Sequence, residues 1–249
     1  MKNMFLKHGL RPRPSDATFF HMWNSDEELF AAMRSTLFSA VVGDVLDSMG
    51  FFHQFLPPAI QPLRDDMVVL GRAMPVLSED ISDGETRLAA SQSKRPFGLM
   101  IDALDSLQKN EVYVCTGASP DYALFGELMA TRATTLGANG AVLNGYSRDT
   151  PGILKLGFPT FSLGRFAQDQ RPRGRVVGYR TTVQLGQVTV SPGDIVFGDL
   201  DGVVIIPQSI VRDVVSEAIE RVAREELVRE AFVKSGVSAA DAMEKYGAL

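Results

Sequence analysis

A strand, a helix and a second strand follow one another in the middle of the chain, and their order limits the folds available to it. Residues 111–116 (EVYVCT) are a β-branched and aromatic run that is typical of a buried strand, and residues 122–136 have the periodicity of a helix. Residues 141–144 (AVLN) indicate another buried strand. Two sequential strands joined through a helix run parallel, with a right-handed crossover. The pattern therefore predicts an α/β fold around a parallel strand pair.

The rest of the chain adds helices and strands on both sides of this unit. Helices are expected at residues 26–37, 41–49 and 96–105, and strands at residues 67–75, 159–163 and 176–185. Ser25 and Glu28 have the spacing of a capping box at the start of the first helix. In residues 186–207, Gly and Pro interrupt short apolar runs, as in strands joined by tight turns. Together these patterns predict a compact α/β/β sandwich.

The two ends of the chain differ from this central part. Residues 1–25 have no clear periodicity and are expected to form an N-terminal arm. Residues 26–208 are expected to form the α/β/β domain. Residues 209–249 begin with a long amphipathic helix, which has Val and Ala on one face and Arg and Glu on the other, and end in a tail.

Composition excludes several classes of protein. With 249 residues, the chain can bury a full apolar core in one large or two small domains. Its apolar runs are far shorter than the ~18 residues that a membrane span needs, and its basic N-terminus lacks the apolar region of a secretory signal. The net charge of −5, with scattered basic residues, disfavours nucleic acid as a partner. The single cysteine, Cys115, excludes an internal disulfide and indicates a reducing, cytoplasmic location.

Familiar catalytic motifs are absent. The chain contains no GxSxG, P-loop, HExxH or GxGxxG sequence. Its three histidines, His8, His21 and His53, lie outside the regular part of the pattern and are interpreted as surface or loop residues. A site built on histidine is therefore not expected.

Three charged side chains are expected to meet at one edge of the sheet. Glu127 begins the helix of the strand–helix–strand unit, and Arg148 and Asp149 follow its second strand. Helix starts and the loops after parallel strands share the carboxyl edge of the sheet, where ligands bind. Two carboxylates without Cys or His nearby suit Mg2+ or Mn2+, and Arg148 adds a permanent cation for a carboxylate or enolate oxygen. The alternative is an ordinary surface ion pair.

The same region carries a resemblance to a known family. Residues 123–149 (ALFGELMATRATTLGANGAVLNGYSRD) resemble the signature of the RraA-like family, which includes the class II 4-hydroxy-4-methyl-2-oxoglutarate/4-carboxy-4-hydroxy-2-oxoadipate aldolases and regulators of ribonuclease E activity. Residues 41–49 (VVGDVLDSM), 71–75 (GRAMP) and 190–207 (VSPGDIVFGDLDGVVIIP) resemble other family motifs in the same order. The resemblance implies an α/β/β sandwich of the swivelling-domain type, assembled as trimers or hexamers with the active site at a subunit boundary.

The resemblance also implies a role for each residue of the site. The family's aldolases carry an acidic residue, twenty intervening residues and Arg-Asp, which here are Glu127, Arg148 and Asp149. Asp149 would hold the Mg2+ or Mn2+, Glu127 would bind it through water, and Arg148 would contact the substrate. The residues whose amides would hold the substrate carboxylate stand at the helix start: Gly126, Leu128 and Met129. The aldolases have Asp where this chain has Glu127, and the added methylene could alter the geometry of metal or substrate.

The C-terminal helix is expected to complete the site of a neighbouring subunit. The family's aldolases extend this helix so that a glutamate enters the neighbour's site, which places residues 209–249 at a subunit interface. Four glutamates are candidates, and Glu225 or Glu226 is favoured over Glu220 and Glu230. The alternative is a solvated helix face.

Two functions from different classes follow from the resemblance. The first is a divalent-metal-dependent aldolase that cleaves 4-hydroxy-2-oxo acids to pyruvate and a second oxo compound, with oxaloacetate decarboxylation as a side activity. The alternative is a non-catalytic regulator that binds a ribonuclease or another protein. The long C-terminal helix and the presence of both Arg148 and Asp149 favour the enzyme. A third interpretation, a Schiff-base aldolase that uses Lys155, has no acid or base partner in the sequence.

Overall fold

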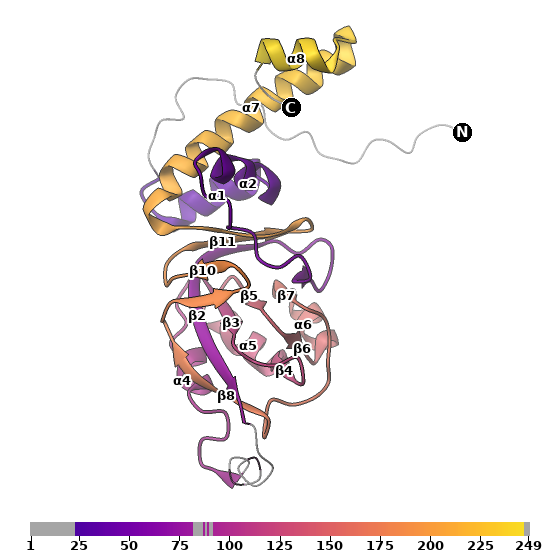
Figure 1. Ribbon diagram of the computed structural model, residues 1–249. Coiled ribbons are helices and arrows are strands. Elements are labelled where there is room, and N and C mark those ends of the chain that lie inside the picture. Colours follow the sequence, from indigo (N-terminus) through magenta and orange to yellow (C-terminus); the bar gives the residue numbers. More distant parts are fainter. Residues whose placement is uncertain (1–22, 82–86, 88, 90–91, 247–249) are drawn as a thin grey trace, which may run out of the picture.

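A mixed sheet of eight strands forms the body of the molecule in the computed structural model, which describes residues 23–81, 87, 89 and 92–246 (Figure 1). The strands follow the order β1 (Gln61–Pro62), β7 (Thr160–Ser162), β5 (Gly140–Leu143), β3 (Glu111–Thr116), β2 (Val69–Asp80), β11 (Ile195–Asp199) and β12 (Gly202–Ile206), and β8 (Gly174–Tyr179) pairs with β2. Strands β2, β3, β5 and β7 are parallel. The predicted parallel pairing of β3 with β5 is therefore confirmed.

Both faces of the central strands are covered, which explains why all six residues of β3 are buried. Helix α5 (Glu127–Thr135) packs beside α4 (Met100–Asp105) and α6 (Thr150–Leu156), and apolar residues of all three join the core of the sheet. The hairpin of β9 (Val183–Leu185) and β10 (Val188–Val190) packs against β2 and β3. Helices, main sheet and hairpin are the three layers of the expected α/β/β sandwich.

A second apolar cluster lies between the sheet and the helical end of the molecule (Figure 1). It joins α1 (Asp26–Thr36), α2 (Ser39–Ser48) and the first half of α7 (Val211–Ser235) to side chains of β11 and β12. The predicted cap of α1 is confirmed, because Ser25 Oγ accepts a hydrogen bond from the Glu28 amide at 3.2 Å. The Glu28 carboxylate accepts one from the Asn24 amide at 2.8 Å, one residue earlier than a standard capping box.

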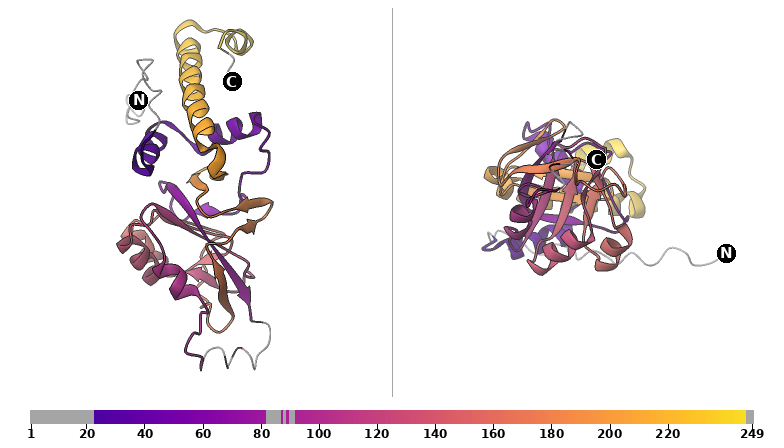
Figure 2. Two further views of the ribbon diagram at one scale, coloured as in Figure 1. Left: turned by 90° about the vertical axis from the view of Figure 1, so that its left-hand side faces the viewer. Right: turned by 90° about the horizontal axis from the view of Figure 1, so that it is seen from below.

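The C-terminal helices extend away from the sheet, as the side view in Figure 2 shows. A short 3-10 turn (Gln208–Ile210) leads into α7, which confirms the long helix predicted from residue 209. The second half of α7 packs on α8 (Ala239–Tyr246) through a small cluster around Val228 and Ala242. Among the described residues no single helix is both long and apolar enough to span a bilayer; α1 and α2 pass that test only as a pair bent by 104°.

Two predicted helices begin later than the sequence suggested. The start of the 122–136 segment is strand β4 (Ala123–Phe125), whose three residues are all buried and which pairs in parallel with β6 (Tyr146–Ser147). Gly126 then has extended backbone angles, and α5 begins at Glu127. The helix expected from residue 96 begins only at Met100, because Gly98 has a φ of +62° and bridges to Val176.

Two predicted strands also differ in extent. Residues 176–185 contain two strands, β8 and β9, because Arg180 turns the chain with a φ of +54°. Strand β2 continues beyond Pro75 to Asp80. Pro75 is tolerated because β11 pairs with β2 only as far as Arg72 and β8 pairs with it only from Val76, so the proline lies between these two partners.

The predicted domain boundaries stay predictions. Residues 1–22 of the expected N-terminal arm lie outside the described residues. The first half of α7 shares an apolar cluster with α1 and α2, so the apolar packing continues from the domain across residue 208 into the C-terminal helix.

Candidate active site

Two short parallel strands bring the predicted site residues together. Strand β4 leads into α5 at Gly126, and β6 leads through Arg148 and Asp149 into α6. The Arg148 amide donates to the Phe125 carbonyl at 2.9 Å, which fixes the end of β6 against the end of β4. Glu127 therefore lies beside Arg148 and Asp149, as the strand–helix–strand pattern predicts.

Asp149 has an unusual backbone conformation that turns its side chain toward α5. Its φ of 55° and ψ of 34° lie in the left-handed region, which Asp tolerates better than most residues. In this conformation Oδ2 accepts a hydrogen bond from the Glu127 amide at 3.3 Å and lies 3.4 Å from Arg148 Nε. The carboxylate is thereby held at the positive end of the α5 dipole.

Two glycines make room for the two carboxylates. A Cβ on Gly126 would lie 2.6 Å from Asp149 Oδ2 and 3.2 Å from Arg148 Cγ. A Cβ on Gly152 would lie 2.3 Å from Glu127 Cδ, so the Glu127 carboxyl group rests directly on the main chain of α6. Gly126 was expected at the site from the sequence, whereas Gly152 was not; its role depends on contact with a residue far away in the sequence.

Arg148 has a second carboxylate partner that the sequence did not indicate. Its Nη1 lies 3.0 Å from Oδ1 of Asp169, which belongs to the loop between β7 and β8. Side chains of Arg148, Asp149 and Asp169 are 34%, 44% and 44% exposed, so the cluster is open to solvent. Asp169 stands in no recognisable motif, and only the path of the loop brings it to Arg148.

The start of α5 also provides unpaired main-chain donors. The first hydrogen bond within the helix runs from the Ala130 amide to the Gly126 carbonyl, so the three preceding amides have no acceptor inside the helix. Asp149 accepts from the first of them, Glu127. The amides of Leu128 and Met129 remain for an anionic ligand, and the Leu128 side chain is 83% exposed.

The donor set suits a hard divalent cation. Asp149 and Glu127 offer only carboxylate oxygens, and Oδ1 of Asp149 has no hydrogen-bond partner among the described residues. Within the same part of the chain no three His, Cys, Asp or Glu side chains form a metal-binding group. Mg2+ characteristically uses one or two protein carboxylates and fills its other positions with water and substrate oxygens. The residues therefore fit Mg2+, or the chemically similar Mn2+, which would take its remaining ligands from water and substrate.

The C-terminal glutamates do not reach this site within one chain. Glu225 and Glu226 lie on α7, at the opposite end of the molecule from α5 and α6 (Figures 1 and 2). Glu225 pairs with Arg221 Nε at 3.4 Å, and Glu226 pairs with Arg229. Both are engaged on their own helix, so a role at an active site would require the site of another subunit.

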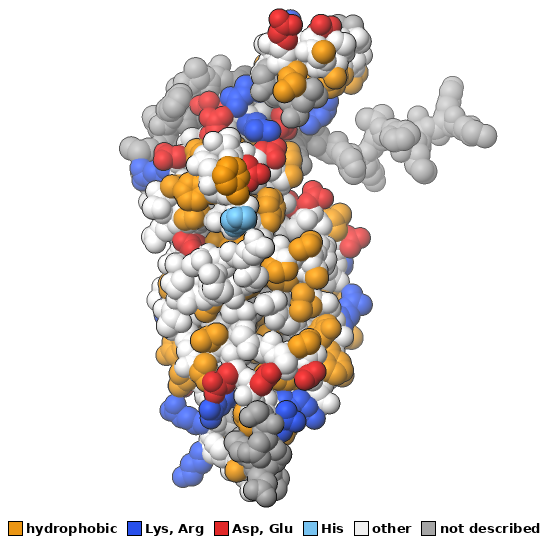
Figure 3. Space-filling view, in the orientation of Figure 1, with side chains coloured by type: hydrophobic (Ala, Val, Ile, Leu, Met, Phe, Trp, Pro, Cys, Tyr) orange, Lys and Arg blue, Asp and Glu red, His pale blue; other side chains and the backbone are white. Residues whose placement is uncertain are grey.

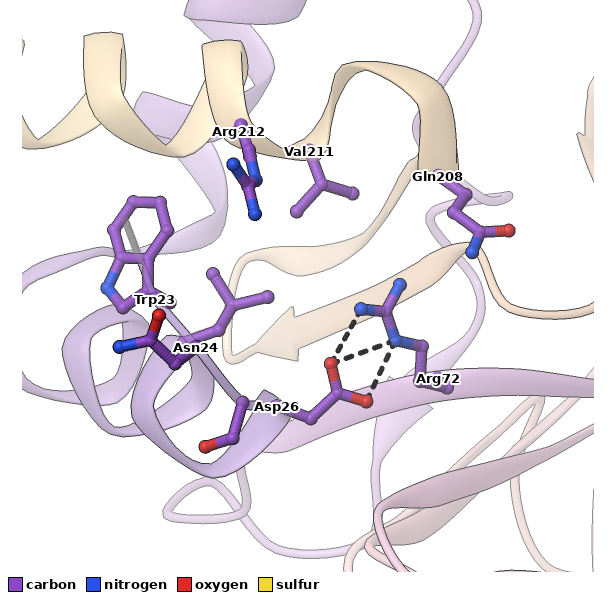
Figure 4. Close-up of a pocket in the computed structure, with 9 residues that line it drawn as sticks. Trp23, Asn24, Asp26, Arg72, Gln208, Val211 and Arg212 are labelled. Carbon is purple, nitrogen blue, oxygen red and sulfur yellow. Dashed lines mark hydrogen bonds and ion pairs between the residues drawn. The ribbon is translucent and has the colours of Figure 1, made fainter. Parts of the chain in front are cut away.

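A separate pocket lies at the helical end and contains none of the predicted site residues. It has a volume of about 420 Å³ and lies between the starts of α1 and α7 and strand β2, as Figure 4 shows. Its charged centre is already paired, because Arg72 Nη2 lies 2.6 Å from Asp26 Oδ1 and Nη1 donates to the Gly193 carbonyl. This pocket is therefore separate from the site at Arg148 and Asp149.

Comparisons with known proteins agree with the fold. The family model for "RraA-like: Aldolase/RraA" matches residues 39–205. A protein of Halalkalibacterium halodurans, named "Putative 4-hydroxy-4-methyl-2-oxoglutarate aldolase", is 28% identical over 213 residues, which are 84% of this chain and 91% of that protein. Protein DlpA of Legionella pneumophila is 27% identical over 209 residues, 84% of this chain; the match spans only 32% of DlpA.

A solved structure shows the same fold. Streptomyces coelicolor RraAS2, described as an unusual member of the RNase ES inhibitor RraA protein family, superposes with a TM-score of 0.69 at 24% identity, over 82% of this chain and 98% of that chain. The match of the family model to more than half of the residues settles the family that the motifs indicated: the protein belongs to the RraA-like (Aldolase/RraA) family.

Proposed function

We propose that the protein is a divalent-metal-dependent aldolase that cleaves 4-hydroxy-2-oxo acids to pyruvate and a second oxo compound. The observation that carries the proposal is the Arg148–Asp149 pair, which is held at the N-terminus of α5 with Glu127 beside it. A cation, a carboxylate and unpaired amides converge there on a space that is open to solvent. Relatives named as aldolases of this substrate class support the proposal.

Electrostatics explain why such a site needs a metal ion. Glu127, Asp149 and Asp169 contribute three negative charges around Arg148, and a second cation, Arg173, donates from Nη1 to the Asp169 carbonyl at 3.3 Å. An oxo-acid anion would be repelled by this local excess, and a divalent cation would neutralise it. When bound by Asp149, and by Glu127 through water, Mg2+ or Mn2+ would act as a Lewis acid that stabilises the negative charge of a pyruvate enolate.

The side chains and amides of the chain would bind and orient the substrate. The amides of Leu128 and Met129 would hold the carboxylate next to the 2-oxo group, since both face outward from the positive end of α5. Arg148 would donate hydrogen bonds to the oxygen that gains negative charge as the C3–C4 bond breaks. Glu127 would orient the water that accepts the C4 hydroxyl proton, and the electron pair of the C3–C4 bond would move onto the pyruvyl fragment.

The same arrangement would decarboxylate oxaloacetate. Loss of CO2 from oxaloacetate leaves the same pyruvate enolate, which is then protonated at C3 to give pyruvate. Arg148 and the α5 amides contact the part of the substrate that both reactions share. Oxaloacetate decarboxylation is therefore expected as a side activity, and it requires no residue beyond those that bind the pyruvyl part of the substrate.

We also propose that the enzyme works as a homo-oligomer, a trimer or hexamer, with residues 209–249 at the subunit interface. Figure 3 shows apolar side chains spread over one face of the molecule, and large exposed apolar residues include Phe52, Phe55 and Leu200, with Leu227 and Val233 on α7. Exposed apolar surface of this kind is typical of protein interfaces. Glu225 or Glu226 of one subunit would then complete the site of another.

The proposal is tested by assaying the purified protein for pyruvate release from oxaloacetate and from 4-hydroxy-4-methyl-2-oxoglutarate. EDTA should abolish the activity, and Mg2+ or Mn2+ should restore it. The control variant is Asp105→Asn. It breaks an exposed ion pair between Asp105 of α4 and Arg132 of α5, the helix that begins at Glu127, and it should leave activity unchanged. Full activity after exhaustive chelation would reject metal dependence. No pyruvate from either substrate, at any metal concentration, would favour the alternative, a non-catalytic regulator of a ribonuclease or another protein.

A further inference from the structure

Asp169 and Asp149 bind different nitrogens of the Arg148 guanidinium group. Asp169 Oδ1 lies 3.0 Å from Nη1, and Asp149 Oδ2 lies 3.4 Å from Nε. Two carboxylates from separate loops thereby fix both the position and the rotation of a planar group. Nη2 has no acceptor among the described residues and is left for a ligand.

The main chain around Asp169 is firmly attached to the rest of the site. The carbonyl of Gln168 accepts a hydrogen bond from the Ala123 amide at 2.8 Å, at the start of β4. The neighbouring Gln170 is 4% exposed, and its carbonyl accepts from the Gly174 amide at 2.9 Å. The main chain on either side of Asp169 is therefore bonded to the starts of β4 and β8, although the Asp169 side chain is half exposed.

From this geometry we propose that Asp169 is a positioning residue, which holds the Arg148 guanidinium so that Nη2 faces the substrate oxygen. The inference rests on the proposed function, because it concerns the orientation of a group that acts on a pyruvyl substrate. Asp169 itself contacts no reacting atom. Its effect passes through Arg148, whose long side chain would otherwise sample several rotamers.

A structural role and a metal-binding role explain the contact less well. An ion pair whose side chains are 34% and 44% exposed contributes little to stability. A metal-binding role fits Asp169 less well, because its Oδ1 already lies 3.0 Å from Arg148 Nη1, whereas Oδ1 of Asp149 has no hydrogen-bond partner among the described residues. The contact between Asp169 and Arg148 is therefore best explained by its effect on the orientation of the Arg148 guanidinium.

The first experiment compares Asp169→Asn, Asp169→Glu and the control Asp105→Asn in oxaloacetate decarboxylation. Asp169→Asn keeps the shape but loses the charge, and kcat should fall about 10-fold while KM changes less than about 3-fold, because the lost interaction serves the transition state. Asp169→Glu should restore most of kcat, since a longer carboxylate can still reach Nη1. Asp105→Asn should match the wild type. Wild-type kcat for Asp169→Asn would overturn the inference, as would a loss of Mg2+ binding.

A double-mutant cycle separates positioning from an independent effect. If Asp169 acts through Arg148, adding Asp169→Asn to Arg148→Lys should lower kcat by less than about 2-fold, whereas independent effects would multiply. A further 10-fold loss in the double mutant would reject the positioning role.

Crystal structures of the wild type and Asp169→Asn give a measurement that needs no turnover. The Arg148 guanidinium should be ordered in the wild type and displaced or disordered in the variant. An unchanged Arg148 in the variant would overturn the inference. Absence of pyruvate formation by the wild type would instead reject the proposed function, and the two crystal structures would still decide whether Asp169 fixes Arg148.

Discussion

Arg148 and Arg180 both bind carboxylates, but the fold satisfies the two guanidinium groups to different degrees. Arg180 Nη1 and Nη2 lie 2.7 and 2.8 Å from the two oxygens of Glu111, and Nη2 also donates to the Ser106 carbonyl at 2.5 Å. Arg148 makes longer contacts, of 3.0 and 3.4 Å, with two different carboxylates and keeps Nη2 without an acceptor in the described chain.

The difference separates a structural pair from a candidate catalytic one. The bidentate Arg180–Glu111 pair uses the full fork of the guanidinium, and the Glu111 side chain is only 11% exposed. It ties the start of β3 to the turn after β8, and both Nη atoms of Arg180 already have acceptors. The pair around Arg148 lies at the edge of the sheet, where the fold holds the group in place and leaves hydrogen-bonding capacity for a substrate.

The largest expected effect is that of Asp149→Ala. Removal of this carboxylate takes away the proposed direct metal ligand and the acceptor of the Glu127 amide, so pyruvate formation should fall by ~10³-fold or more. The melting temperature should fall only by a few degrees, because the side chain is 44% exposed but Ala tolerates the left-handed backbone less well than Asp. Calorimetry should show that Mg2+ binding is lost. Retained Mg2+ affinity would remove Asp149 from the metal site.

Arg148→Lys should have the next largest effect. Lysine keeps the charge but lacks the planar fork that contacts Asp149 and Asp169 and is proposed to contact the substrate, so kcat should fall ~10²-fold, comparable to the loss of one oxyanion donor. The measurement is steady-state kinetics with oxaloacetate. Turnover near that of the wild type would show that charge alone suffices and that the open guanidinium has no special role.

Glu111→Gln tests the other side of the comparison. The substitution leaves Arg180 without its charged partner in a mostly buried setting, and the free energy of unfolding should fall by about 2 kcal/mol, less than for a fully buried pair because Arg180 is 31% exposed. Chemical denaturation measures this loss. Activity per folded molecule should be unchanged, and a specific loss of kcat would mean that the pair also serves the catalytic site.

Gly152→Ala should lower catalysis less than Asp149→Ala or Arg148→Lys. A methyl group at this position would meet the Glu127 carboxyl group at 2.3 Å and displace it, so kcat should fall about 10-fold with little change in stability. Gly178→Ala is the matched control, because a methyl group there would meet nothing closer than 3.8 Å. Equal kcat values for the two variants would show that the position of the Glu127 carboxylate does not affect proton transfer.

The sequence predicted the parts of the site that lie on the strand–helix–strand unit, and it did so for a physical reason. Helix starts and post-strand loops share one edge of a parallel sheet, so Glu127, Arg148 and Asp149 had to lie near one another. Asp169 and Gly152 could not be predicted, because their roles depend on how a loop and a short helix pack against distant residues. Periodicity also failed at β4, where a buried apolar run of three residues fits a strand or a helix equally well.

The last prediction concerns the part of the site that a single chain does not supply. The Arg180 pair is complete within one chain, whereas the Arg148 site is proposed to need Glu225 or Glu226 from another subunit. If so, a variant at Asp149 and a variant at that glutamate damage different halves of the same site. In a closed trimer with random mixing, about a quarter of the boundaries would combine two intact halves. Co-refolded Asp149→Ala and Glu225→Ala, or Asp149→Ala and Glu226→Ala, should therefore recover about a quarter of wild-type activity, measured against each variant refolded alone. If mass measurements confirm mixed oligomers and no activity returns with either pair, neither Glu225 nor Glu226 completes the Arg148 site of another subunit.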